Sequence, residues 1–253
     1  MARVSIFFSF AMKKGAKTAR FGFSFRGFCG ITGGRMNLAD IRTDYRRGRL
    51  SRADLRPSPF EQFDLWMEEA LREGVLEPTA MSLATVGCDG APLLRTVLLK
   101  GVSPEGFVFF TNLTSRKAAQ IGENAQAALL FPWLALQRQV IVRGPVVPVS
   151  REEVRRYFSS RPHESQLAAW ASRQSQPIAS RAELEARLVE VKARFGEGEV
   201  PLPDFWGGYR VEPATIEFWQ GGANRLHDRF QYRRSPAGPT AVTGDWFIER
   251  LSP

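Results

Sequence analysis

Two β-rich runs joined by a short turn occupy residues 80–100. The runs read AMSLATV (80–86) and PLLRTVLLK (92–100), and the turn between them reads GCDG (87–90). A connection this short that contains Gly and Asp is typical of a hairpin between antiparallel strands. This stretch therefore predicts a mostly antiparallel sheet.

Strand-like runs continue along the chain on both sides of a segment with helical features. They are GFVFFTN (106–112), AALLF (127–131), LQRQVIVRGPVVPV (136–149), YRVEPATIEFWQ (209–220), NRLHDRFQY (224–232) and DWFIERL (245–251). Many short strands in one chain are most naturally closed as a barrel or a sandwich. We therefore expect an α+β fold, mainly β with helices, in which the last strands rejoin the barrel.

Three capping boxes predict where helices begin. Ser58-Pro59-Phe60-Glu61 places proline at the first helical position, and the apolar residues after it recur at helical spacing. We expect an amphipathic helix over about 59–73. Ser150 and Ser180 begin the other two capping boxes, so residues 150–196 are expected to form a helical insert.

The amino-terminal leader, residues 1–36, differs in composition from the single domain expected over residues 37–253. Residues 1–39 carry seven basic side chains and no acidic one, so they supply most of the net charge of +9; the remainder has 28 basic and 26 acidic residues, a net charge of +2. We expect the leader to be disordered or not translated, with translation starting at Met36. An organelle transit peptide and a functional basic arm are the alternatives.

Composition also excludes several classes of function. Two cysteines and two histidines are too few for a four-ligand zinc site, an iron–sulfur cluster or a disulfide framework. The longest apolar stretch, AALLFPWLAL (127–136), contains a proline and is shorter than the roughly 18 residues of a membrane-spanning helix. We therefore expect no metal and no membrane span. Because the body of the chain is nearly neutral, we also expect no nucleic-acid partner.

Two segments predict sites for phosphate groups. In the first, a strand, a hydroxyl-rich turn and a helix start bring together Arg95, Lys100, Arg116 and Lys117. Cations and free N–H groups at a helix amino terminus suit a phosphate dianion, although a solvated surface is the alternative. Arg95 and Lys100 have opposite strand parity, so one of them must lie at a bend or a strand end.

The second segment, RRYFSSRPHESQLAAW (155–170), contains Tyr157, Arg161 and Ser165 at a spacing of four residues. Pro162 disfavours helical geometry at the residue before it and is expected to start a new helix. A phenol, a guanidinium and a hydroxyl at such a break can hold a second phosphate. The alternative is a tyrosine in the core and an arginine in water.

A third cluster, NRLHDR (224–229), is sorted by the alternation of a strand. Arg225, His227 and Arg229 would point to one face. Two flanking arginines repel each other and favour a neutral imidazole, and an anionic partner would relieve that repulsion. An exposed polar face is the alternative.

The long motifs of this chain occur in a fixed order. They are RTVLLK (95–100), FFTNLTSRKA (109–118), LFPW (130–133), SRPHESQLAAW (160–170), RQSQ (173–176), GEVPLPDFWGGYRV (198–211) and IEFWQGGANRLHDRF (216–230). In these motifs the sequence closely resembles the pyridoxamine/pyridoxine 5′-phosphate oxidase family over residues 37–253. The resemblance implies an FMN-binding split β-barrel of antiparallel Greek-key type with a smaller helical part, assembled as a homodimer with FMN at the subunit interface.

The resemblance also implies residue roles. FMN contacts fall on Arg95, Thr96, Val97, Leu98, Leu99, Lys100, Phe110, Thr111, Arg116, Lys117, Gln139, Gln174, Ser175, Trp219 and Arg229. Substrate contacts fall on Arg42, Tyr45, Lys100, Tyr157, Arg161, Ser165, Arg225, Leu226 and His227. Arg225 and His227 are implied to be catalytic, and which of them handles a proton stays open.

The implied activity is oxidation of the C4′ carbon of pyridoxamine or pyridoxine 5′-phosphate, which yields pyridoxal 5′-phosphate in vitamin B6 salvage. Hydride passes to FMN N5, and dioxygen reoxidises the flavin to give hydrogen peroxide. We expect a cytoplasmic enzyme, or an organellar one if the leader is a transit peptide. Another split-barrel flavin reductase and a non-catalytic FMN or pyridoxal phosphate carrier are the alternatives.

Overall fold

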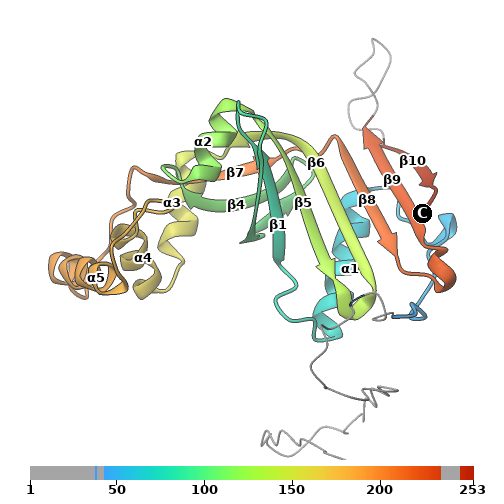
Figure 1. The fold of residues 1–253 in the computed structure, drawn as a ribbon, viewed down its shortest axis with the longest axis horizontal. Coiled ribbons are helices and arrows are strands. Elements are labelled where there is room, and N and C mark those ends of the chain that lie inside the picture. The colour runs from blue at the N-terminus through green and yellow to red at the C-terminus, as the bar shows by residue number, and fades with distance from the viewer. Residues whose placement is uncertain (1–37, 39–42, 235–245) are drawn as a thin grey trace, which may run out of the picture. The chain divides into compact units, whose positions relative to one another are not determined.

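The computed structural model describes residue 38, residues 43–234 and residues 246–253 (Figure 1). The predicted leader and Arg42 lie outside these residues. The helices are α1 (Pro59–Arg72), α2 (Arg116–Glu123), α3 (Arg151–Ser159), α4 (His163–Ala171) and α5 (Arg181–Phe195). The strands are β1 (Ala80–Val86), β2 (Pro92–Leu98), β3 (Gly101–Ser103), β4 (Gly106–Asn112), β5 (Gln126–Trp133), β6 (Arg138–Pro148), β7 (Trp206–Val211), β8 (Thr215–Gln220), β9 (Asp228–Arg234) and β10 (Trp246–Leu251).

Strands β1 to β7 form a ring of antiparallel pairs. β1 and β2 make the predicted hairpin, with Ala80 opposite Leu98. From β1 the pairing passes to β5, β6, β7 and β4 in turn. β3 follows β2 after a short bend and pairs with β4, which completes the ring. The predicted antiparallel barrel is confirmed.

The sheet branches at β6, because this strand changes one of its partners along its length. Residues 138–143 pair with β8, whereas residues 146–148 pair with β7. Gly144 lies between the two stretches, and a Cβ atom there would collide with the backbone oxygen of Glu212. Strands β8, β9 and β10 therefore extend the sheet from β6 instead of closing the ring (Figure 1). Of the last strands, only β7 rejoins the barrel, and the run predicted over 209–220 is two strands.

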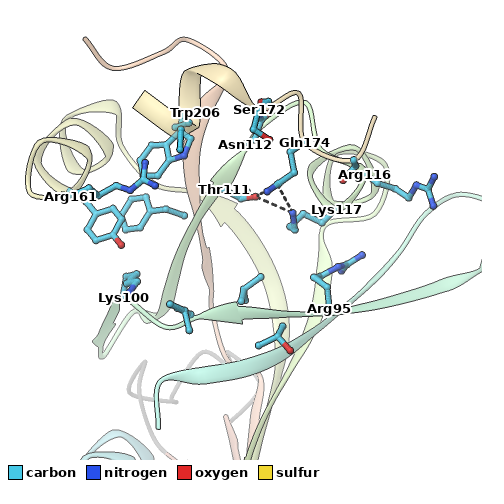
Figure 2. Close-up of a pocket in the computed structure, with 18 of the residues that line it drawn as sticks. Arg95, Lys100, Thr111, Asn112, Arg116, Lys117, Arg161, Ser172, Gln174 and Trp206 are labelled. Atoms are coloured by element: carbon cyan, nitrogen blue, oxygen red, sulfur yellow. Dashed lines mark hydrogen bonds between the residues drawn. The ribbon is translucent and has the colours of Figure 1, made fainter. Parts of the chain in front are cut away.

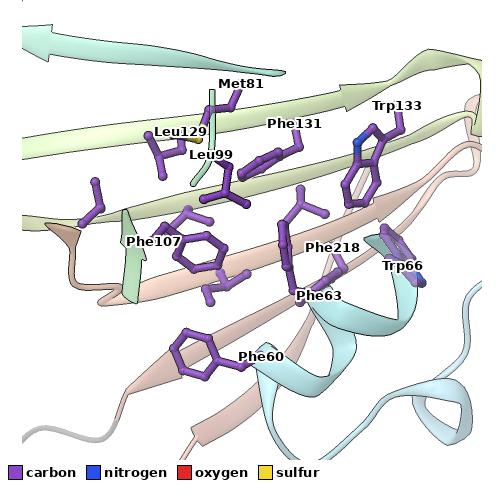
Figure 3. Packing of buried hydrophobic residues seen from close by; sticks show 14 of the residues in the cluster. Phe60, Phe63, Trp66, Met81, Leu99, Phe107, Leu129, Phe131, Trp133 and Phe218 are labelled. Atoms are coloured by element: carbon purple, nitrogen blue, oxygen red, sulfur yellow. The ribbon is translucent and has the colours of Figure 1, made fainter. Parts of the chain in front are cut away.

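Helix α1 supplies aromatic side chains to the main core (Figure 3). The ring of Phe63 lies 5.0 Å, centroid to centroid, from both Phe107 and Phe131, and Trp66 lies 5.1 Å from Phe218. The predicted cap is present, because the Ser58 hydroxyl accepts a hydrogen bond from the N–H two residues later. Burial of these rings fixes α1 against the sheet.

A second core holds the predicted helical insert to the barrel. Val154, Phe158 and Leu167 from α3 and α4 pack on Trp206, the first residue of β7. Helix α3 ends before Pro162 and α4 begins directly after it, as predicted. The hydroxyls of Ser150 and Ser180 cap α3 and α5, which confirms both capping sites.

The strand predicted over residues 224–232 is wrong in its first half. Asn224 and Arg225 have left-handed φ angles of 55° and 62°, and β9 begins only at Asp228. Before them, Gly222 lets the chain turn tightly, because a Cβ atom there would collide with the carbonyl oxygen of Leu226. Arg225 and His227 therefore lie in a turn and do not share a strand face with Arg229.

Candidate active site

A cavity of about 840 Å³ lies between β2, β4 and the helices α2 to α4 (Figure 2). Its volume is typical of a site for a small organic ligand. The predicted site residues that line it are Arg95, Thr96, Val97, Leu98, Lys100, Phe110, Thr111, Arg116, Lys117, Tyr157, Arg161, Gln174 and Ser175. Neither Asp nor Glu is among the described residues that line this cavity. The two predicted phosphate segments thus meet at one site.

Three cations gather at one end of the cavity, which we call the cation end: Arg95, Arg116 and Lys117 (Figure 2). The Lys117 ammonium donates hydrogen bonds to Gln174 Oε1 at 2.7 Å and to Thr111 Oγ1 at 3.2 Å. Burial and the nearby charge of Arg95 lower the pKa of Lys117 to about 8. Because neutral acceptors hold the ammonium, its charge stays available to an anion.

The bend after β2 explains how Arg95 and Lys100 both reach the cavity. β2 ends at Leu98, and the backbone N–H of Lys100 already donates to Val108 in β4. Lys100 is therefore the residue at the strand end, which resolves the conflict of parity. Leu99 differs from its neighbours, because its side chain packs in the main core and does not line the cavity.

The opposite end of the cavity is aromatic and carries Arg161 (Figure 2). Phe110 stacks on Tyr157 with ring centroids 4.1 Å apart, and the Arg161 guanidinium carbon lies 4.9 Å from the ring centre of Trp206. The buried Nη1 of Arg161 has no hydrogen-bond partner in the described part of the chain. Burial also lowers the pKa of Arg161. A buried guanidinium nitrogen left without a partner indicates a place for an anionic ligand.

The remaining predicted residues lie elsewhere. Ser165 is in the first turn of α4, as predicted, but does not line the cavity. A separate group, which we call the C-terminal cluster, consists of Tyr45, Gln139, Trp219, Arg225, Leu226, His227 and Arg229, and none of these lines the cavity either.

Pairing of β6, β8 and β9 assembles the C-terminal cluster. Trp219 lies opposite Gln139 on one side and Arg229 on the other. The rings of Trp219 and His227 are 4.7 Å apart, and Tyr45 contacts both at 5.7 to 5.8 Å. Residues far apart in sequence thus form one aromatic and basic surface.

Two contacts within this cluster settle how its polar groups are used. The Gly222 N–H donates to Nδ1 of His227 at 3.1 Å, so the neutral imidazole carries its proton on Nε2. Arg229 pairs with Glu217 at 2.7 Å. Glu217 is thus an anionic partner that balances one of the two arginine charges, and Arg225 does not share a strand face with Arg229.

Sequence reasoning missed several residues of the cavity. Trp206 lines the cavity and also belongs to the second core. Asn112 and Ser172 also line it, and Asn112 accepts a hydrogen bond from the Thr114 N–H at 2.7 Å. An Asn two residues before a Thr at a strand end is a recognisable turn signal that could have identified this position.

Comparison with known proteins places this geometry in a family. Residues 67–195 match the family model described as pyridoxamine 5′-phosphate oxidase, and residues 206–253 match the pyridoxine 5′-phosphate oxidase C-terminal dimerisation region. The chain belongs to the pyridoxamine 5′-phosphate oxidase family. The C-terminal cluster falls mostly within the part that matches the dimerisation region of this family.

The chain matches curated relatives in this family over nearly the full length of those relatives. A pyridoxine/pyridoxamine 5′-phosphate oxidase of Hahella chejuensis is 55% identical over 219 residues, which are 86% of this chain and 100% of the relative. The protein of the same name from Shewanella frigidimarina is 53% identical over 217 residues, with 86% and 99% covered.

Solved structures show the same fold. PhzG from Burkholderia lata, in complex with tetrahydrophenazine-1-carboxylic acid, has a TM-score of 0.73 at 30% identity and covers 79% of this chain and 95% of its own. An FMN-binding protein related to pyridoxamine 5′-phosphate oxidase, from Nostoc punctiforme, has a TM-score of 0.62 at 16% identity, a likeness of fold alone. The predicted split-barrel fold is confirmed. None of the described helices is long and apolar enough to cross a membrane.

Proposed function

We propose that this protein is an FMN-dependent oxidase that converts pyridoxine and pyridoxamine 5′-phosphate to pyridoxal 5′-phosphate in vitamin B6 salvage. One observation carries the proposal: a single cavity has cations at both ends and no carboxylate among its described lining residues. Such a cavity suits two ligands that each carry a phosphate. The names of the curated relatives support the same reaction.

The cation end fits the phosphate of FMN. Arg95, Arg116 and Lys117 leave positive charge unbalanced there, and the amino terminus of α2 adds its N–H groups. Several other FMN residues implied by the family line the same cavity: Thr96, Val97 and Leu98 on β2, Lys100 just after it, Phe110 and Thr111 on β4, and Gln174 and Ser175 after α4. Bound FMN would supply the two-electron acceptor for a hydride from C4′ of the substrate and would be reoxidised by dioxygen, which is reduced to hydrogen peroxide; with the amine substrate, hydrolysis of the resulting imine by water would release ammonia.

The aromatic end fits the phosphate of the substrate. Arg161 offers its unpartnered Nη1 there, Tyr157 lies beside it, and Lys100 lies across the cavity (Figure 2). Two phosphate anchors at opposite ends hold two flat ring systems in one register. This positioning is the main contribution that the protein makes to a hydride transfer.

We further propose that a second copy of the chain completes each site. In one protomer the C-terminal cluster does not line the cavity, yet the family assigns Arg225 and His227 to the substrate and Trp219 and Arg229 to FMN. The match to a dimerisation region supports a homodimer. Exposed apolar side chains lie beside both surfaces: Leu94 is 69% exposed next to the cavity, and Leu226 is 72% exposed in the cluster. Burial of such side chains favours association.

The cluster offers two different groups to the substrate. Because Nδ1 of His227 accepts the Gly222 N–H, the ring presents its Nε2–H as a hydrogen-bond donor. Arg225 offers a cation to negative charge that develops on the substrate ring. We therefore propose His227 as a hydrogen-bond donor to an oxygen of the substrate.

Residues 37–253 are proposed to form the catalytic domain, located in the cytoplasm. Relatives that carry the name of the oxidase are matched over 99–100% of their length by 86% of this chain, which supports a catalytic domain shorter than the whole chain.

The full-length protein loaded with FMN tests the proposed function. Addition of pyridoxine 5′-phosphate without air should bleach the visible flavin band, and air should restore it with formation of aldehyde and hydrogen peroxide. A bound flavin that never bleaches would favour another reductase or a carrier. A folded protein that cannot be loaded with FMN would contradict the proposal at its root.

A further inference from the structure

Arg95 is held by a chain of hydrogen bonds that leads away from the cavity. Its Nη1 donates to Thr85 Oγ1 in β1 at 2.6 Å and to the Leu83 carbonyl oxygen at 3.1 Å. The Thr85 hydroxyl donates in turn to Gln120 Oε1 in α2 at 2.6 Å, and Gln120 Nε2 donates to the Ala91 carbonyl oxygen at 3.4 Å. Thr85 is 1% exposed and Gln120 7% exposed. Neither residue lines the cavity.

This chain can run in one direction only. A guanidinium has no acceptor, so Thr85 must accept from Arg95, and its single proton is left to donate to Gln120. Gln120 must then present its carbonyl oxygen to Thr85 and its amide nitrogen to Ala91. Within this series of hydrogen bonds, each bonding atom of Arg95, Thr85 and Gln120 has a partner, which sets one rotamer for each of the three side chains.

The acceptors in this series of hydrogen bonds are neutral, which affects the net charge of the cation end. Arg95 lies close enough to Lys117 for its charge to lower the pKa of that lysine, so the two cations repel each other. A carboxylate beside Arg95 would relieve the repulsion but would also cancel the charge that an anion needs. A hydroxyl and a carbonyl oxygen hold the guanidinium in place and leave its charge uncancelled.

Gln120 links the position of Arg95 to the position of the other two cations at the cation end. It lies three residues after Lys117 on α2, so the two side chains leave neighbouring positions on the helix surface. The hydrogen bond from Thr85 thus connects the strand next to Arg95 with the helix that carries Arg116 and Lys117. A second contact supports this connection, since Glu123 of α2 accepts from the Cys88 N–H in the β1–β2 turn at 2.9 Å.

We propose that Thr85 and Gln120 are positioning residues that hold Arg95 at a fixed place relative to Lys117, so that the cation end is ready for a phosphate before the ligand arrives. The inference rests on the proposed function in one respect, that the phosphate belongs to FMN. It predicts that loss of the Thr85 hydroxyl weakens recognition of the phosphate group and leaves recognition of the flavin ring unchanged.

The test compares FMN with riboflavin, which has the same ring system and no phosphate. Dissociation constants for both are measured by flavin fluorescence with full-length apoprotein of wild type, Thr85→Val, Thr85→Ser and the control Thr215→Val, whose side chain lies outside the cavity. Valine keeps the shape of threonine and removes both hydrogen bonds. We expect Thr85→Val to weaken FMN binding by about tenfold, equivalent to about 1.4 kcal/mol, with riboflavin unchanged. Thr85→Ser and Thr215→Val should bind both ligands as wild type does.

A double-mutant cycle makes the test independent of small effects on folding. In a chain that already lacks the guanidinium, Arg95→Ala, the additional change Thr85→Val should have no further effect on FMN binding. Gln120→Met, which keeps the length of the side chain, should reproduce the phosphate-specific loss if Thr85→Val fails to fold.

Several results would overturn the inference. Equal losses for FMN and riboflavin would mean a general structural role, as would additive effects of Arg95→Ala and Thr85→Val. Unchanged FMN binding by Thr85→Val would overturn the inference alone and leave the proposed function intact. Wild-type protein that does not bind FMN would overturn both.

Discussion

The cation end and the C-terminal cluster both contain arginines, and they treat the charge of those arginines differently. At the cation end, Arg95 is held by a hydroxyl and a carbonyl oxygen, and Lys117 by neutral oxygens. In the cluster, Glu217 neutralises Arg229. A cationic side chain held by neutral groups remains free to bind an anion. A cationic side chain paired with a carboxylate instead helps to hold neighbouring strands together.

The two regions also differ in completeness. The cation end is assembled within one protomer by β2, β4 and α2, which are near each other in sequence. The cluster is assembled by β6, β8, β9 and the segment around Tyr45, and within one protomer it faces no cavity that contains the other site residues. Under the proposed function, the FMN phosphate binds within one chain, whereas catalysis needs two.

The largest effect is expected from a change in the cluster that leaves the cavity untouched. Arg225→Ala should retain bound FMN and lower kcat/KM for pyridoxine 5′-phosphate by about 10² to 10³, because a charge that stabilises the transition state is lost. Steady-state peroxide formation per bound flavin measures this. Loss of FMN with normal turnover of the flavin that remains bound would contradict the division between the two regions.

A smaller effect, on binding alone, is expected at the cation end. Lys117→Met should weaken FMN binding by about 10- to 100-fold, because a charge-assisted hydrogen bond to the phosphate is lost. Flavin fluorescence titration measures it, and riboflavin binding serves as the control. An equal loss for riboflavin would mean that Lys117 supports the fold instead of the phosphate.

The pH dependence of FMN binding sharpens the same point. The pKa of Lys117 is lowered to about 8 in the free protein. Between about pH 7, where the phosphate monoester is a dianion, and that pKa, the lysine is already protonated and affinity should be flat. Above it binding must take up a proton, so affinity should fall by up to about tenfold per pH unit. The Lys117→Met variant should lose this dependence. A wild-type affinity that stays constant between pH 7 and pH 9.5 would contradict the shifted pKa.

The smallest effect is expected where charge is balanced. Glu217→Gln removes the partner of Arg229, whose side chain is 30% exposed, and should lower the free energy of unfolding by about 1 kcal/mol. Urea denaturation measures the change. If Glu217→Gln instead altered FMN affinity more than stability, Arg229 would belong with the ligand-binding cations.

Elements with a strong local pattern were predictable from the sequence. The β1–β2 hairpin, helix α1 and the capped starts of α3 and α5 follow from turn chemistry, apolar spacing and capping residues. The break at Asn224 and Arg225 was not, because a strand-like alternation there is overridden by the tight turn at Gly222. Local propensity is weak where a close approach of backbone atoms decides the conformation.

The candidate site divides in the same way. Local chemistry identified six residues that line the cavity, and the resemblance to the family added seven more; all thirteen lie in a few short segments. Thr85 and Gln120 carried no such signal, because their importance comes from a contact across 35 positions of sequence. The pairing of Arg229 with Glu217 was equally invisible, and it balances one of the two arginine charges in that cluster.

By itself, the sequence determined the antiparallel barrel, the helical insert and the types of side chain available to bind phosphate, because these depend on periodicity, caps and composition within short stretches. Only the tertiary structure decided which charges are balanced, which strand end brings Lys100 into the cavity, and that the C-terminal cluster lies apart from it. Those outcomes depend on distances between segments far apart in the chain, and the free energy of a charge is set by whatever group folding places beside it.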